Sequence, residues 1–268
     1  MNNIEIKHVV DFHKWTRPGP EVDIGIFANI LPDGDGYIGA ARCGAMDIMD
    51  QIHIVTYDSE FNLLDSKKVT KGEDPRCFFF GGTPYALTWS PEATGLEYKV
   101  VNLKTREVTN LLIDGVSRAP LSKFGKNWMP LEKDGQLYII VSLEPKICVL
   151  HCDLETGNCQ WVEGFEADGD IQVTLSRGGT PFIYNETLDR YIGFGHRSYS
   201  AYHHNIYFYT ISTDFKSVTI GEDIYTEKIN VQDPLSIFSK NDKIYFCVGN
   251  WNVPDDGEMN LYELTISN

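Results

Sequence analysis

The stretch "KGEDPRCFFF" (residues 71–80) places two carboxylates, a proline and an arginine immediately before a run of apolar, strand-forming residues. Taken alone it is ordinary turn chemistry, because Asp-Pro favours turns and mixed charge clusters are commonly solvated. Three later segments have the same form, and the four prolines are Pro75, Pro130, Pro181 and Pro234. Successive prolines lie about 50 residues apart, which is close to the period of a propeller blade.

Short β-rich runs separated by turn residues dominate the whole chain. Examples are residues 51–57, 137–143 and 243–248, and helical periodicity is almost absent. Polar turn residues between such runs predict hairpins at Asp134-Gly135, at Asn241-Asp242 and at residues 156–158. The sequence therefore predicts an all-β fold.

The segment after each of these prolines follows one order: a short strand, a polar turn, an aromatic-rich strand, a loop and further strands. Residues 24–70 supply a similar unit without the proline. We therefore expect one domain over residues 1–268, a five-bladed β-propeller with four-stranded antiparallel blades around a central channel. The expected blades are residues 24–70, 73–115, 126–165, 177–222 and 231–267. The polar residues before each proline should then meet at one mouth of the channel.

Composition limits the classes of partner. The 268 residues are 42% hydrophobic and 23% charged, which predicts a folded domain. The formal net charge of −15 argues against nucleic acid and anionic membranes as partners. No secretory signal or bilayer-spanning run is visible, so the expected location is cytoplasmic, and a homo-oligomer stays open.

Cysteine and histidine patterns do not predict a metal site. Most of the six cysteines lie in apolar, strand-like segments, so we expect buried free thiols rather than disulfides. Cys148, His151 and Cys152 have no second ligand pair at a zinc-like spacing. His203 and His204 are adjacent on a predicted strand and face opposite sides, so we expect rim residues there.

Three motifs together resemble a known enzyme family. "GEDPR" (72–76), "KNWMP" (126–130) followed by "LYIIVSLEP", and "RGGTPFI…YIGFGHR" (177–197) are similar, in this order, to motifs of glycoside hydrolase family 130. That family comprises five-bladed propeller enzymes, the β-mannoside phosphorylases and hydrolases, with related β-1,2-mannosyltransferases. The resemblance covers about residues 24–267 and implies a carbohydrate substrate and inversion at a glycosidic bond. It implies no cofactor, with inorganic phosphate or a sugar donor as a possible co-substrate.

The resemblance assigns the catalytic acid to Asp74. Inverting glycoside chemistry needs an acid for the leaving oxygen and a nucleophile on the opposite face of the sugar. We expect Glu73 and low-dielectric walls to raise the pKa of Asp74, so that it holds a proton at neutral pH.

The remaining candidates are polar residues of the predicted inner strands. Substrate-binding candidates are Arg42, Glu73, Arg76, Lys126, Asn127 and Asp233, and the anion or phosphate-binding candidates are Arg177, His196 and Arg197. For Arg76 two roles stay open: orienting Asp74 or the sugar, or bridging Glu73. Asp233 is also a possible base for a hydrolase. Trp128 is expected in the blade core rather than under a sugar.

Other functions remain open at this point. Residues 77–116 lack the additional basic residues that the phosphorylases of the family use, which leaves hydrolysis as an alternative. A glycosyltransferase with a nucleotide-sugar or sugar-phosphate donor is a second alternative. A non-catalytic glycan-binding propeller is the third, because fold does not fix function. It predicts a flat mouth without a deep acidic pocket.

Overall fold

The computed structural model describes residues 3–16, 26–43, 51–93, 95–114, 126–167, 176–200, 203–224, 231–252 and 256–267. All regular secondary structure in these ranges is β-strand, which confirms that the fold is all-β. Within the same ranges, no helix has the length and apolar character needed to cross a lipid bilayer.

The first two sheets each contain four consecutive strands. The first comprises β2 (Ile26–Asp33), β3 (Gly36–Cys43), β4 (Gln51–Tyr57) and β5 (Leu63–Lys71). The second comprises β6 (Glu73–Phe80), β7 (Thr83–Glu92), β8 (Gly95–Asn102) and β9 (Val108–Asn110). The polar start of the opening stretch is thus the beginning of β6, where a proline has no ladder hydrogen bond to lose.

The third sheet has five strands in the order β10-β14-β13-β12-β11. They are β10 (Leu112–Ile113), β11 (Met129–Lys133), β12 (Gln136–Ser142), β13 (Cys148–Cys152) and β14 (Asn158–Trp161). β10 follows the second sheet in the chain and pairs parallel to β14 of the third sheet. The second and third sheets are therefore connected at their outer edges as well as by contacts between β6 and β11.

The fourth sheet has nine strands and two halves. One half comprises β15 (Ser176–Gly179), β16 (Ile183–Asn185), β17 (Arg190–Ser200), β18 (His203–Ser212) and β19 (Val218–Ile224). The other comprises β20 (Val231–Lys240), β21 (Lys243–Asn252), β22 (Asp256–Ser267) and β1 (Asn3–Thr16). A single parallel pair, His204 with Val231, joins the halves.

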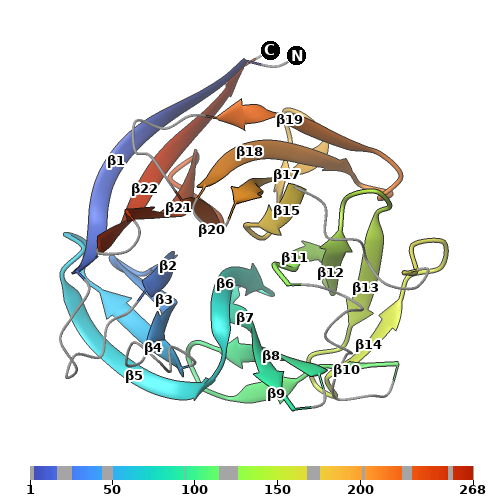
Figure 1. Cartoon of the computed structure of the whole chain (residues 1–268), viewed down its shortest axis with the longest axis horizontal. Coiled ribbons are helices and arrows are strands. Elements are labelled where there is room, and N and C mark those ends of the chain that lie inside the picture. The colour runs from blue at the N-terminus through green and yellow to red at the C-terminus, as the bar shows by residue number, and fades with distance from the viewer. Residues whose placement is uncertain are drawn as a thin grey trace.

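The sheets surround a common centre. Figure 1 shows β2, β6, β11, β15 and β20 nearest this centre, with later strands of each unit farther out. β6 contacts β2, β11 and β20, and β15 contacts β20. None of the sheets formed by the described strands closes on itself.

The N-terminal strand completes the last unit. β1 pairs antiparallel with β22 along almost its full length, so the two ends of the chain lie side by side (Figure 1). The predicted last blade spans residues 231–267, where the structure describes three strands, β20, β21 and β22. β1 pairs with β22, although no strand was predicted for residues 3–16.

The predicted hairpins are confirmed. Asp134 and Gly135 connect β11 to β12 with φ of 53° and 70°. Asn241 and Asp242 connect β20 to β21 with φ of 51° and 59°. Two successive positive φ angles are the type I′ geometry that matches the twist of the flanking strands. Residues 156–158 lie at the junction of β13 and β14.

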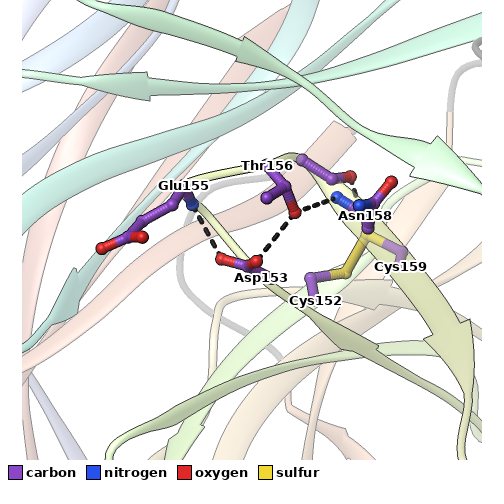
Figure 2. Close-up of a disulfide and its surroundings, with 7 residues drawn as sticks. Cys152, Asp153, Glu155, Thr156, Asn158 and Cys159 are labelled. Carbon is purple, nitrogen blue, oxygen red and sulfur yellow. Dashed lines mark hydrogen bonds between the residues drawn. A yellow bond between two sulfur atoms is a disulfide. The ribbon is translucent and has the colours of Figure 1, made fainter.

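The cysteine prediction is right for four residues and wrong for two. Cys43, Cys77, Cys148 and Cys247 are buried cysteines outside any disulfide. Cys152 and Cys159 form a disulfide across the β13–β14 hairpin, because the strand register places them opposite each other. Figure 2 shows the tight turn between them, where the Asp153 carboxylate accepts hydrogen bonds from the Glu155 amide and the Thr156 hydroxyl. Disulfides persist mainly in oxidising compartments. This pair therefore argues against the cytoplasmic location, which stays a prediction.

Two buried side chains fix the inner strands. Asn29 of β2 donates its amide to the carbonyls of Phe27, Ala40 and Pro75 and accepts from the amide of Cys77 at 2.7 Å. It thereby joins the first sheet to β6. Trp128 is fully buried, as predicted, and stacks on Tyr98 with ring centroids 3.6 Å apart.

Candidate active site

Asp74 lies at the centre of the ring of sheets, at the start of β6. It is 7% exposed and has a φ of 46°, a left-handed conformation that is uncommon for a residue other than glycine. Its Oδ1 lies 3.0 Å from Arg42 of β3, and its Oδ2 lies 3.1 Å from the ammonium of Lys126. Strained backbone of this kind concentrates at functional sites, where surrounding contacts hold it in place.

Asp74 is ionised in this environment, and the expected upward pKa shift is wrong. Burial opposes ionisation, but Lys126, Arg42 and Arg76 together outweigh burial and lower the pKa of Asp74 below its ordinary value of 3.8. Glu73 does not reverse this effect, because its carboxylate lies 3.0 Å from Nη2 of the same Arg42. One guanidinium thus holds two consecutive carboxylates.

Arg76 lies deeper in the structure than Asp74. It is 3% exposed, and its Nη2 donates to Oδ1 of Asn127 at 3.1 Å. Its Nε is buried without a hydrogen-bond partner among the described residues. The arginine that pairs with Glu73 is Arg42, not Arg76. Arg76 instead hydrogen-bonds to Asn127 and so connects β6 to the residues before β11.

A second buried carboxylate, Asp233 of β20, lies with two histidines. Its Oδ1 is 3.0 Å from Nδ1 of His204 and 3.5 Å from Nε2 of His196. Burial opposes the ionisation of Asp233, but His196 and His204 lead the contacts that lower its pKa below the usual range. Burial lowers the pKa of His196 to about 4, despite the nearby Asp233 charge, so its imidazole is neutral at neutral pH.

Arg76 connects the two carboxylate sites electrostatically. Its positive charge acts on both Asp74 and Asp233, and their negative charges counter the effect of burial on the Arg76 guanidinium. A buried arginine that faces two carboxylates stabilises both in the ionised form.

Arg177 and Arg197, the two arginines predicted to bind an anion, lie in different surroundings. Arg177 of β15 pairs across from His196, and its Nε is buried without a partner among the described residues. Arg197 pairs with the Asp223 carboxylate, donates to the carbonyl of Gly221 and covers the ring of Tyr207. Adjacent strand residues face opposite sides, so the structure does not bring Arg197 together with His196.

Two residues near the site were missed by sequence analysis. His204 was expected at the rim, but it contacts Asp233. Trp89 of β7 pairs across from Glu73, and the ammonium of Lys126 lies 5.3 Å from its ring centroid. Its indole Nε1 is buried without a partner among the described residues, so Trp89 has an unused hydrogen-bond donor close to Lys126.

The central group is locally cationic in an acidic chain. Among the residues that the structure describes, four basic side chains and three carboxylates meet there: Arg42, Arg76, Lys126 and Arg177 with Glu73, Asp74 and Asp233. The whole chain has a formal charge of −15. The centre can therefore attract a polar or anionic ligand that the rest of the molecule would repel.

Comparisons with known proteins connect this chain to glycoside hydrolases through the fold. No family model matches the sequence, and no curated protein matches it. A protein from Bacteroides ovatus assigned to the glycoside hydrolases has a TM-score of 0.66 at 12% identity, with 96% of each chain covered. An exo-β-1,3-galactanase from Phanerochaete chrysosporium, solved with β-1,3-galactotriose, has a TM-score of 0.59 at 8% identity, covering 92% of this chain and 64% of that one.

A third solved structure is an α-L-arabinofuranosidase of glycoside hydrolase family 43 from Clostridium thermocellum. Its TM-score is 0.56 at 11% identity, and the match covers 84% of this chain and 81% of that chain. Identities this low show a shared all-β fold and nothing about substrate. The specific resemblance to family 130 stays a prediction.

Proposed function

We propose that the protein is a carbohydrate-active enzyme that acts on a glycosidic bond at the centre of the ring, beside Asp74. The observation that supports this most is the geometry of Asp74: a buried, ionised carboxylate in a left-handed backbone conformation, held by Arg42 and Lys126. The shared fold with glycoside hydrolases agrees with this assignment.

Because the pKa of Asp74 is low, its carboxylate has no proton to donate when the site is empty. An ionised carboxylate accepts a hydrogen bond or a proton, so in the empty site Asp74 is suited to bind a sugar hydroxyl rather than to donate a proton directly. The resemblance to family 130 implies an acid that works through such a hydroxyl. The hydroxyl would give its proton to the glycosidic oxygen and recover one from Asp74.

Lys126 offers a route to the protonated form. Its side chain is 40% exposed, whereas Asp74 beneath it is buried, so Lys126 is the partner that an entering sugar can displace most readily. Loss of that contact removes the leading cation that lowers the Asp74 pKa. Substrate binding would then raise the pKa of Asp74 toward the value that an acid requires.

The finer assignment is a β-mannoside-type substrate, cleaved with inversion, with inorganic phosphate or water as the nucleophile. Arg177 and His196 are the phosphate candidates that lie on neighbouring paired positions near Asp233. Arg197 is engaged with Asp223 and is left out of this group. In a hydrolytic reaction Asp233 would instead activate water, because its carboxylate is ionised.

We further propose that the nine-stranded sheet is two blades, which gives five in a single domain over residues 1–268. Among the described residues, its halves share one backbone ladder pair, His204–Val231, and β1 pairs with β22 at the edge of the second half. Each of the five units then begins with one of the inner strands β2, β6, β11, β15 and β20 (Figure 1).

The test compares wild type with Asp74→Asn on a panel of β-mannosides and other β-glycosides, each with and without inorganic phosphate. Release of free sugar reports hydrolysis, and formation of a sugar 1-phosphate reports phosphorolysis. We expect at least a hundredfold lower turnover in Asp74→Asn, since acid–base groups typically contribute that much. Asp65→Asn, on the outer strand β5, is the matched control and should keep full activity. Equal activity of wild type and Asp74→Asn would exclude the proposed role.

A further inference from the structure

His196, His204 and Asp233 form a three-residue cluster where the two halves of the nine-stranded sheet meet. They come from β17, β18 and β20, three strands that are neighbours in the sheet order. One nitrogen or oxygen from each side chain lies within 4.8 Å of the others. The two imidazole rings stack with centroids 5.0 Å apart and planes 26° from parallel.

The distances in this cluster match the spacing of ligands around a small divalent metal ion. Ligand atoms of tetrahedral zinc are separated by about 3.4 Å, as bonds of about 2.0 to 2.2 Å require. The Nε2 of His196 and the Nδ1 of His204 lie 3.5 Å and 3.0 Å from Oδ1 of Asp233. Small side-chain rotations are therefore sufficient to bring all three atoms to one ion.

His196 has hydrogen-bonding capacity that the described residues do not use. It is 2% exposed, its Nε2 approaches Asp233 only at 3.5 Å, and its Nδ1 has no hydrogen-bond partner among the described residues. Buried polar side chains are almost always paired, and each exception needs an explanation. Ser198, which pairs across from His204, also has a buried hydroxyl without a partner in the part of the chain that the structure describes. His196 and Ser198 of β17 thus both keep an unsatisfied polar atom next to this cluster.

We propose that His196, His204 and Asp233 bind a divalent first-row transition metal ion such as zinc. Two imidazoles and one carboxylate are a donor set that suits these metals, whereas calcium and magnesium prefer oxygen ligands. The adjacent residue His203 faces the opposite side of β18, so the second imidazole comes from β17 instead. The proposed metal site was not predicted from the sequence, because its two histidines come from different strands.

The proposed ion keeps an open coordination position. Three protein ligands leave a fourth place for water or a ligand oxygen, as in catalytic rather than structural zinc sites. His204 is the most accessible of the three side chains, which places the open side next to it. Arg76 and Arg177 lie close enough to act on His196, so the fourth ligand should be anionic to offset their charge.

Metal binding is tested on the full chain after treatment with a chelator. Zinc is titrated in competition with a chromophoric chelator, and cobalt absorption spectra report the ligand type. We expect one zinc per chain, no comparable calcium binding, and cobalt bands without thiolate character. His204→Ala and Asp233→Asn should each weaken zinc binding by at least about tenfold. His203→Ala is the matched control, since it removes the neighbouring exposed imidazole, and should leave the affinity unchanged.

Each other outcome overturns the proposal. If wild type binds zinc no more tightly than His204→Ala, or if His203→Ala loses as much affinity as His204→Ala, the metal lies elsewhere. Thiolate bands in the cobalt spectrum would assign the ion to a cysteine. Urea denaturation of each variant identifies any loss caused by unfolding, and Asp233→Asn gives a second, nearly isosteric variant. None of these readouts depends on enzymatic activity, so they are independent of the proposed function.

Discussion

The ammonium of Lys126 lies 3.1 Å from Oδ2 of Asp74, although the two residues belong to different units of the ring. Asp74 begins β6, whereas Lys126 lies just before β11. The contact therefore exists only when the inner strands are assembled. It makes the ionisation of the central carboxylate depend on a half-exposed side chain from the next unit.

Lys126→Gln should raise the pKa of Asp74. An opposite charge within hydrogen-bond distance lowers a carboxyl pKa by about 1 to 3 units, and the exposure of Lys126 favours the lower end, about one unit. Carbon-13 NMR titration of the carboxyl groups measures the change, with Asp74→Asn used to assign the signal. Lys133→Gln, which removes the surface pair with Asp134, is the control. An unchanged Asp74 pKa in Lys126→Gln would show that Arg42 and Arg76 alone hold the carboxylate ionised.

Arg76→Gln should destabilise the fold. Arg76 is buried, acts on two carboxylates and donates to Asn127, so its removal leaves charge and an amide oxygen uncompensated. Removing one partner of a buried ion pair costs about 3 to 5 kcal/mol. Urea denaturation gives the unfolding free energy, and the exposed Arg106→Gln should change it by less than about 0.5 kcal/mol. If Arg76→Gln lowers the unfolding free energy as little as Arg106→Gln does, water solvates the carboxylates and the Asn127 oxygen in place of Arg76.

Acid should remove the stability that Asp74 contributes. Because the folded pKa of Asp74 is lower than its ordinary value of 3.8, the contribution is complete above that value and is lost as pH falls through the folded pKa. In Asp74→Asn, the unfolding free energy should therefore fall less steeply below about pH 4. Asp242→Asn, in the β20–β21 turn, should keep the wild-type slope. A slope in Asp74→Asn equal to that of wild type contradicts a lowered folded pKa.

Local sequence patterns predicted the class of fold but not the pairing of distant strands. Alternating apolar residues and turn pairs are local signals, and they correctly predicted the β content and the hairpins at Asp134-Gly135 and Asn241-Asp242. The pairing of β1 with β22 joins the two ends of the chain. No local pattern specifies such a partner, because the choice depends on which sheet edge remains open after the other strands have paired.

In the candidate active site, local sequence patterns also failed to predict which side chains lie next to each other. Counting back from the β6–β7 turn places Ser90 across from Glu73, but a bulge between Glu73 and Arg76 brings Trp89 there instead. Alternation along a strand correctly separates His203 from His204 but cannot tell which of them faces Asp233. Charge pairing was also missed, since the effect of Arg42 and Lys126 on Asp74 depends on distances between sheets.

Removal of the disulfide should cost stability without loss of fold. Cys152 and Cys159 are seven residues apart, and closing a loop of that length stabilises by about 2 kcal/mol in the chain-entropy account. Urea denaturation of the Cys152→Ala/Cys159→Ala double variant against wild type measures the difference. Cys148→Ala, which changes a buried free thiol in the same sheet, separates loss of the bond from loss of packing. Equal stability of the double variant and wild type would show that the bond does not constrain the unfolded chain.

Asn29→Ala should reduce both stability and the proposed activity, because Asn29 fixes the position of β6. Its side chain makes four hydrogen bonds. Two of them are to backbone groups of Pro75 and Cys77, which lie in the first half of β6. Alanine leaves these buried groups without partners, at a cost of about 3 kcal/mol. Asp74 precedes Pro75 directly, so displacement of β6 also moves the central carboxylate away from Arg42. Asn110→Ala, at an exposed position of β9, is the control for urea denaturation and for turnover. Normal turnover in a destabilised Asn29→Ala would show that Arg42 and Lys126 position Asp74 without help from β2.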